Sequence, residues 1–288
     1  MGLLRIAREV KHLGLVSVKK ARPTLVRLCD GALDVYTALR LRGHSYEFRP
    51  ERYRRSFLVR RLLSEPIAGE MPGQVFCFWT GSNPLTENRE RNLRGMEKKI
   101  GLPVILVTPQ NLGEWVKADW PLHPAYEFLS LVHRSDYLRA YFLHHYGGGY
   151  CDIKAPTPRW DRVWQSVSHR QDVWYVARGH ESSGHVASLP GALGLDVRMW
   201  HRIIPSNLAC LARSHTPLTL EWLTEVERRL DYFYPQLKEF PGGERGAVVG
   251  YPISWNRLLN QVHHPLALKY NEWVVIDDRI DVARADYL

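Results

Sequence analysis

The chain contains little cysteine and no long hydrophobic run. Among its 288 residues are four cysteines, Cys29, Cys77, Cys151 and Cys210, and no two of them form a Cys-x-x-Cys pair. We therefore expect neither a structural zinc finger nor a disulfide framework, and interpret the cysteines as buried thiols in a reducing compartment. No uncharged stretch approaches the roughly 18–20 residues that a membrane span requires.

The amino-terminal region also lacks the apolar segment of a secretory signal peptide, because charges from Arg5 to Lys20 interrupt it. We therefore expect a cytoplasmic protein. Its positive charge is uneven: residues 1–64 carry 15 Lys and Arg against 5 Asp and Glu, whereas the remainder carries 24 against 25. Basic residues interleaved with apolar ones favour peripheral attachment of residues 1–64 to an anionic membrane surface. A basic helical cap packed on the rest of the protein is the alternative.

The pattern changes near residue 72. Residues 1–72 are predicted to be a basic helical extension, with a second basic helix at 53–63, and a stretch rich in Pro and Gly follows. Residues 73–288 alternate between strand and helix patterns, which predicts an α/β domain with a mixed, mostly parallel sheet. The expected strands are 74–79, 103–108, 150–154 and 172–178; the expected helices run from an N-cap at Asn83 to about residue 100, and over 127–146 and 218–232.

Two short segments carry polar groups suited to a ligand. Asp136 and Arg139 are three residues apart on the predicted helix, so they share a face. Tyr150, Asp152 and Lys154 alternate with apolar residues after three glycines, which predicts that these three share one face of a strand. The plain interpretation of Asp136 and Arg139 is a surface ion pair, and that of the strand is a half-exposed one. The functional one is a cleft in which Arg139 donates to a diphosphate and Asp136 accepts from a sugar, with the glycines allowing close approach of the ligand.

These segments resemble a known family pattern. The chain reads Ser-Asp-Tyr-Leu-Arg, a tyrosine-rich helix, and then Gly-Gly-Gly-Tyr-Cys-Asp-Ile-Lys. This is similar to the DXD sugar-binding region of glycosyltransferases that include initiation-specific α-1,6-mannosyltransferases and capsular polysaccharide synthesis proteins. The specific match covers about twenty residues, with a looser likeness over about residues 74–264.

The resemblance implies a GT-A fold, a Rossmann-like domain that binds a nucleotide sugar. It implies that Trp79, Thr80 and Gly81 contact the nucleotide, and that Asp136 and Arg139 hold the donor sugar and phosphate. Asp152 matches the first acid of the DXD motif, and Asn207 resembles an asparagine that lines the acceptor side.

Lys154 departs from the family pattern, whose second acid usually helps to hold a divalent cation. Mg²⁺ and Mn²⁺ need oxygen ligands, and a lysine offers none. Three interpretations follow. Lys154 neutralises the leaving diphosphate itself; or Asp152 and another group, such as His264, hold the metal; or the protein binds a nucleotide sugar without catalysis.

We therefore expect a glycosyltransferase that moves a sugar from a nucleoside-diphosphate donor to a hydroxyl of a glycan or lipid-linked acceptor, with retention, in capsule, polysaccharide or glycan synthesis. Asp152, Lys154 and Arg139 are the expected catalytic residues, and Tyr150 is expected to bind substrate. The rival is a basic protein that binds a membrane surface or nucleic acid. It explains only residues 1–64, and since the rest is slightly acidic, we expect no nucleic-acid partner.

Overall fold

A six-stranded mixed sheet forms the centre of the protein in the part of the chain that the structure describes. This computed structural model describes Val26 and residues 28–39, 43–62, 67–244 and 248–283. The strand order is β2-β1-β3-β5-β4-β6; β5 runs antiparallel to both of its neighbours, and the other pairings are parallel. The strands are β1 (Val75–Phe78), β2 (Val104–Val107), β3 (Gly148–Cys151), β4 (Tyr175–Ala177), β5 (Ala209–Ala212) and β6 (Val274–Ile276). The predicted α/β architecture with a mostly parallel, Rossmann-like sheet is confirmed.

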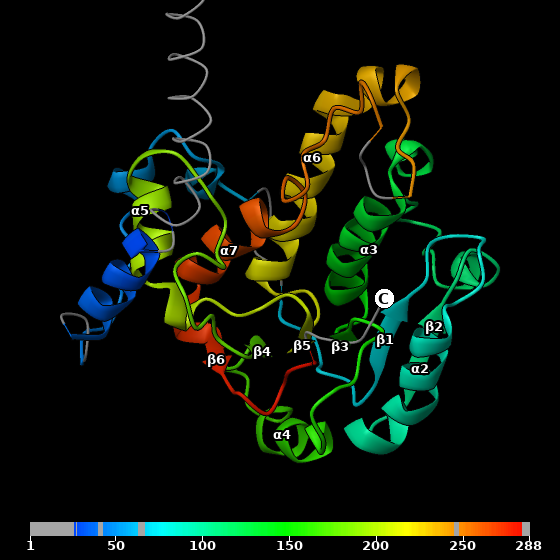
Figure 1. The fold of residues 1–288 in the computed structure, drawn as a ribbon, viewed down its shortest axis with the longest axis horizontal. Coiled ribbons are helices and arrows are strands. Elements are labelled where there is room, and N and C mark those ends of the chain that lie inside the picture. The colour runs from blue at the N-terminus through cyan, green and yellow to red at the C-terminus, as the bar shows by residue number, and fades with distance from the viewer. Residues whose placement is uncertain (1–25, 27, 40–42, 63–66, 245–247, 284–288) are drawn as a thin grey trace, which may run out of the picture.

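Helices cover both faces of this sheet (Figure 1). The α-helices are α2 (Glu87–Ile100), α3 (Leu131–His145), α4 (Trp160–Val167), α5 (Gly191–Met199), α6 (Pro217–Glu239) and α7 (Asn260–Lys269), and residues 28–39 are also helical. Short 3-10 helices are η1 (Pro50–Tyr53), η2 (Phe57–Val59), η3 (Leu112–Glu114), η4 (Pro124–Phe128), η5 (His201–Ile203) and η6 (Asn271–Trp273). The helices α3, α6 and α7 pack on one face of the sheet, and α2 and α4 pack on the other.

Alternation along the strands builds these two layers. Phe76, Phe78 and Tyr150 belong to the core beneath α3 and α6, whereas Cys77 and Cys151 belong to the core above α2 and α4. Side chains of successive strand residues point to opposite faces of the sheet. Because helices cover both faces, short strands such as β1 are apolar at every position. Tyr150 thus points to the α3 side of the sheet.

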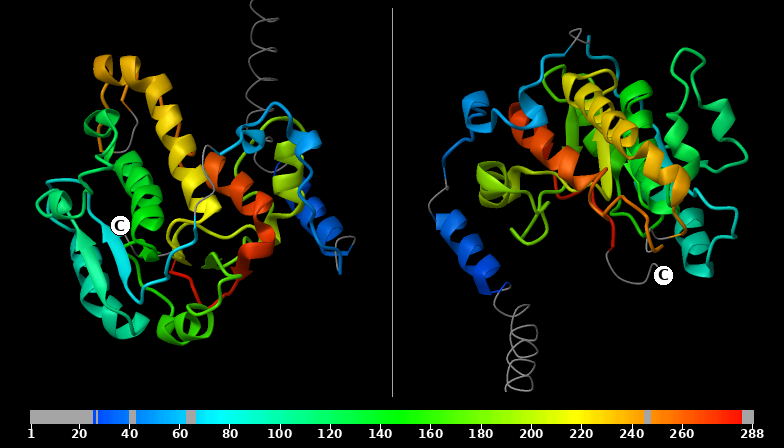
Figure 2. Two further views of the ribbon diagram at one scale, coloured as in Figure 1. Left: turned by 180° about the vertical axis from the view of Figure 1, so that it is seen from behind. Right: turned by 90° about the horizontal axis from the view of Figure 1, so that it is seen from above.

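The described residues before position 72 pack against this domain. Tyr53 and Leu58 belong to its core, and the Tyr53 hydroxyl donates to Asp196 on α5 at 2.5 Å. The helical residues 28–39 lie beside α5 (Figure 2). Asp34 in this helix accepts from the backbone of Ser183 at 2.8 Å. Residues 1–25 of the basic segment lie outside the described residues, so membrane attachment of residues 1–64 stays a prediction. In the described part of the chain, no helix has the length and apolar character needed to cross a membrane.

Several predicted boundaries were wrong. The N-cap of α2 is Thr86, which accepts from Arg89 N, whereas the Asn83 carbonyl accepts from the indole of Trp79. Residues 124–128 form a 3-10 turn before α3, whose N-cap is Ser130. The basic helix predicted at 53–63 is replaced by η1 and η2, and α6 extends to Glu239. Strand β3 ends at Cys151, the last residue paired with β5. The Asp152 N–H still donates to the Leu208 carbonyl at 2.9 Å, and the chain bends at residues 153 and 154.

The glycines before Tyr150 serve chain packing. Gly147 and Gly148 have φ of 65° and 80°, a region that side chains disfavour. A Cβ on Gly148 would lie 2.7 Å from the carbonyl oxygen of Gln74, and one on Gly149 would lie 3.0 Å from that of Cys210. Close backbone neighbours therefore account for these glycines, and the approach of a ligand is not needed to explain them.

A buried arginine fastens the end of β5. Arg213 is 1% exposed and donates to the carbonyl oxygens of Gly69, Ser168 and Arg170 at 2.8–2.9 Å and of Val173 at 3.3 Å. The guanidinium thus joins the end of β5 to two other parts of the chain, Gly69 and residues 168–173. Burial lowers the pKa of Arg213 from its ordinary value.

We expect Arg213→Met to destabilise the protein by about 2–4 kcal/mol, because the buried carbonyl oxygens lose their charged donor. Urea unfolding measures this change in free energy. The control is Arg170→Met, whose side chain is 47% exposed and whose loss we expect to cost within about 0.5 kcal/mol. Equal stability of the two variants would contradict the role given to Arg213.

Candidate functional site

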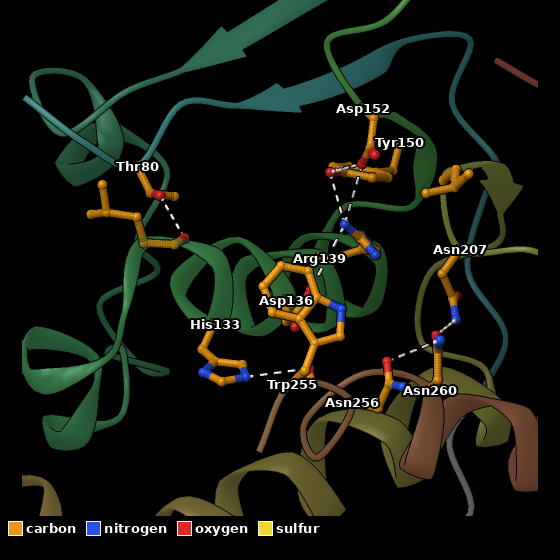
Figure 3. Close-up of polar contacts among 12 residues, drawn as sticks. Thr80, His133, Asp136, Arg139, Tyr150, Asp152, Asn207, Trp255, Asn256 and Asn260 are labelled. Carbon is orange, nitrogen blue, oxygen red and sulfur yellow. Dashed lines mark hydrogen bonds and ion pairs between the residues drawn. The ribbon is translucent and has the colours of Figure 1, made fainter. Parts of the chain in front are cut away.

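A cluster of charged side chains lies where two parallel strands end. Strands β1 and β3 pair in parallel, so their carboxyl ends lie at one edge of the sheet. Thr80 follows β1, and Asp152 follows β3. Helix α3 packs beside this edge and supplies Asp136 and Arg139 (Figure 3). This edge is where sheets of this kind bind ligands.

Arg139 is the centre of the cluster. It is 4% exposed, and its Nη2 donates to the Tyr150 hydroxyl at 2.8 Å and lies 3.5 Å from Oδ1 of Asp152. Its guanidinium lies over the Tyr150 ring, 4.0 Å from the centroid. In the described part of the chain, its Nε and Nη1 have no hydrogen-bond partner. Nearby carboxylates and Tyr150 raise the pKa of Arg139 in spite of burial, so it stays charged.

Asp136 faces the same guanidinium at a longer distance. Its Oδ1 is 3.9 Å from Nη2 of Arg139, and the side chain is 6% exposed. Burial, together with the negative charge of Asp152, raises the pKa of Asp136 to about 7 in spite of the attraction of Arg139. Arg139 therefore has one close carboxylate and one that is only partly ionised at neutral pH.

Asp152 contacts three side chains. Its Oδ1 accepts from the Tyr150 hydroxyl at 2.7 Å, and its Oδ2 is 3.2 Å from the ammonium of Lys154. The predicted common side of Tyr150, Asp152 and Lys154 is therefore confirmed, although the strand ends before Asp152. Cys151 and Ile153 are buried in the opposite core, as predicted.

This set of donors does not fit a site for Mg²⁺ or Mn²⁺. Such ions take several oxygen ligands, usually including carboxylates. Asp152 offers one carboxylate, with a guanidinium near one oxygen and an ammonium near the other. A divalent cation at Asp152 would have to displace Lys154 and lie beside Arg139.

His264 is held elsewhere in the fold. Its Nδ1 accepts from the backbone N–H of Ala187 at 3.0 Å, and its Nε2 lies 3.3 Å from Nε2 of His180. Within the described ranges, no hydrogen bond or ion pair joins His264 to Asp152. A metal shared by these two residues stays a prediction that no contact favours.

The residues after β1 connect that strand to α3. Thr80 Oγ1 donates to the Leu131 carbonyl at 2.7 Å (Figure 3), and a Cβ on Gly81 would lie 2.8 Å from the Leu131 side chain. Trp79 packs under Arg89, whose guanidinium is 5.4 Å from the ring centroid. Arg89 also donates to the carbonyl of Ile153, the residue after Asp152, at 3.5 Å. The sequence analysis missed Arg89, although it lies in the first turn of the helix predicted after Thr80.

Asn207 is part of a chain of amides. Its Oδ1 accepts from the Tyr175 hydroxyl at 3.3 Å, and its Nδ2 donates to Asn260 at 3.1 Å. Asn260 in turn donates to Asn256 at 3.3 Å (Figure 3). The amide of Asn207 is therefore held in one orientation. The sequence analysis missed the other two asparagines, because their spacing of four on a short segment carried no recognised motif.

The loop before α7 adds an exposed aromatic side chain near the cluster. The Trp255 carbonyl lies 3.4 Å from Nε2 of His133, which is one helical turn from Asp136 on α3. The Trp255 side chain is 60% exposed. A large exposed ring at such a place can stack on a base or a sugar.

Comparison with known proteins adds no assignment. No family model matches the chain, and no curated protein matches it either. The site is therefore interpreted from its own geometry.

We expect Asp136→Asn to stabilise the ligand-free protein as pH rises. A carboxyl whose pKa is raised in the folded state contributes stability that is present below its unfolded pKa, near 4, and is lost as pH rises to about 7. Asparagine does not titrate, so the variant should exceed the wild type by on the order of 3 kcal/mol at pH 8 and match it near pH 4.

Chemical denaturation at several pH values between 4 and 8 tests this expectation. The control is Asp119→Asn, since Asp119 is exposed and its replacement should leave the pH dependence unchanged. A constant difference between Asp136→Asn and the wild type across this range would contradict the raised pKa.

Proposed function

We propose that the protein is a glycosyltransferase that uses a nucleoside-diphosphate sugar as donor. The main support is the convergence of Arg139 and Lys154 on Asp152, at the ligand-binding edge of a Rossmann-like sheet. A departing diphosphate carries negative charge that groups held in place can stabilise. The order and spacing of the DXD-like segment support the same class.

In this proposal, the cations act on the leaving group. The bond between the anomeric carbon and the diphosphate oxygen breaks, and the diphosphate keeps the electron pair. Lys154 and Arg139 neutralise the charge that develops there, and Arg89 adds to the positive potential. An ammonium serves as a compact charge with three donors, whereas a guanidinium donates in a fixed fork. Divalent cations are not required.

Asp136 and Asp152 face the sugar. Each carboxylate can accept from a sugar hydroxyl, and Asp152 also limits the repulsion between the two cations that contact it. The acceptor hydroxyl of a glycan or lipid-linked molecule attacks the anomeric carbon. In a retaining transfer, its proton passes to the departing diphosphate oxygen, so no separate protein base is needed. The fixed amide of Asn207 and the ring of Trp255 are suited to hold the acceptor or the base.

We expect Asp152→Asn to lower transfer by about 10²–10³, because it removes a charge that acts in the transition state. A screen of sugar nucleotides, in which release of nucleoside diphosphate is measured, first finds the donor. The control is Asp172→Asn, whose carboxylate is 63% exposed. Full activity of Asp152→Asn with an unchanged melting temperature would refute the site. A donor that binds both proteins but is never turned over would instead favour a non-catalytic nucleotide-sugar binder.

Lys154 gives a separate test of metal dependence. If its ammonium replaces a cation, the wild type should keep its activity in chelator, and Lys154→Ala should be inactive with or without Mn²⁺. Lys154→Asp adds a second carboxylate and should regain activity only with Mn²⁺, because oxygen ligands suit that ion. The control is Lys98→Ala, at an exposed position on α2. Loss of all wild-type activity in chelator, with full recovery in Mn²⁺, would overturn the role of Lys154.

A further inference from the structure

Three histidines gather at the carboxyl end of α3. His144 and His145 are its last residues, and His215 lies in the turn between β5 and α6. One ligand nitrogen from each lies within 4.8 Å of the others, and the described residues contain no other group of three or more His, Cys, Asp or Glu side chains gathered as a candidate metal site. These histidines lie at the opposite end of α3 from its junction with Thr80.

Two of the three rings are buried, and their surroundings leave nitrogens for a ligand. His145 is 5% exposed, and in the described part of the chain neither of its ring nitrogens has a hydrogen-bond partner. Burying a polar group without a partner costs stability, so such a group calls for an explanation. A metal ion would satisfy one nitrogen of His145.

A neighbouring hydroxyl orients His144. Thr219 Oγ1 lies 3.2 Å from Nδ1 of His144 and donates its only proton to the Thr216 carbonyl. In this arrangement the hydroxyl can accept from Nδ1 of His144, and that tautomer leaves the lone pair on Nε2 for a metal. Histidines that bind metals commonly donate their second N–H to an oxygen in this way.

The charges around the cluster favour neutral imidazoles. Burial and the neighbouring histidines together lower the pKa of His144 to about 3, and burial, His215 and Lys117 together lower that of His145 to about 4. Burial also lowers the pKa of His215. Lys117 is the opposing charge, since it acts on His145 and His215 while its ammonium lies 4.8 Å from the Tyr146 ring centroid. A cation in the cluster would be repelled by Lys117, so this residue limits the affinity.

We propose that His144, His145 and His215 form a site for a divalent transition metal ion of the Zn²⁺ class. Imidazole suits Zn²⁺, which binds nitrogen at about 2.0–2.1 Å with tetrahedral geometry. Water completes the coordination from the side of the half-buried His215. The ion joins the end of α3 to the turn before α6, and this site is independent of the sugar-nucleotide chemistry proposed above.

Zinc binding to the untagged full chain tests the proposal. Equilibrium dialysis against Zn²⁺ should find one ion per chain, and bound Co²⁺ should show the intense visible absorption of a tetrahedral site. His215→Ala and His145→Ala should each bind at least about tenfold more weakly. The control is His169→Ala, an exposed histidine, and it should bind as the wild type does. Saturating Zn²⁺ should raise the melting temperature of the wild type and this control by roughly 5 °C.

Lys117→Met separates a metal site from a buried histidine cluster with a packing role. Removal of the nearby positive charge should tighten Zn²⁺ binding several-fold, whereas a packing role predicts no change in affinity. If His145→Ala fails to fold, the Zn²⁺ affinity of His215→Ala decides the outcome, because His215 is only half-buried. Zinc binding that is absent from the wild type, or that is equal in wild type and His215→Ala, would overturn the proposal.

Discussion

The buried guanidinium of Arg139 is the interaction on which the arrangement of the site depends. It stacks on the Tyr150 ring and contacts Asp152, so it ties helix α3 to the end of β3. A desolvated cation–π contact contributes about 2 kcal/mol, and removal of one partner from a buried ion pair costs about 3–5 kcal/mol. The position of Asp152 at the sheet edge therefore depends on the helix as much as on its own strand.

Under the proposed function, the charges in this cluster serve a ligand more than they serve stability. Lys154 and Arg139 both contact Asp152, whereas Asp136 is 3.9 Å away and has a raised pKa. When Asp136 is protonated, Arg139, Lys154 and Asp152 together carry a net positive charge. A diphosphate would complete this balance and replace water that the buried cations have lost. A purely structural network would place the second carboxylate closer to the guanidinium.

Much of the sheet was predictable from the sequence, because its strands are short apolar runs with clear ends. Helix periodicity placed Asp136 and Arg139 on one face, and strand periodicity placed Asp152 with Tyr150 and Lys154. The family resemblance, and not periodicity, implied that the two sets meet in one site. The role of the glycines before Tyr150 could not be read from the sequence. A glycine that makes room for a neighbouring backbone looks the same in sequence as one that makes room for a ligand. Arg89, Asn256 and Asn260 were missed because tertiary contacts alone bring them together with their partners. The basic segment at 53–63 did not form the predicted helix, since Tyr53 and Leu58 are drawn into the core instead.

Helix α3 shows why such a site is costly to build. Most of its residues are buried, including Asp136, Arg139 and both terminal histidines. Helices with so many buried residues are usually apolar on every side, because buried polar groups need partners. Here Arg139 is paired with Tyr150 of β3, and His144 is paired with Thr219 of α6. Two nitrogens of Arg139 and both ring nitrogens of His145 have no hydrogen-bond partner in the described part of the chain. A sequence selected for stability alone would replace these groups with leucine or alanine. Under the two proposals made above, ligands that bind at the two ends of this helix account for their presence.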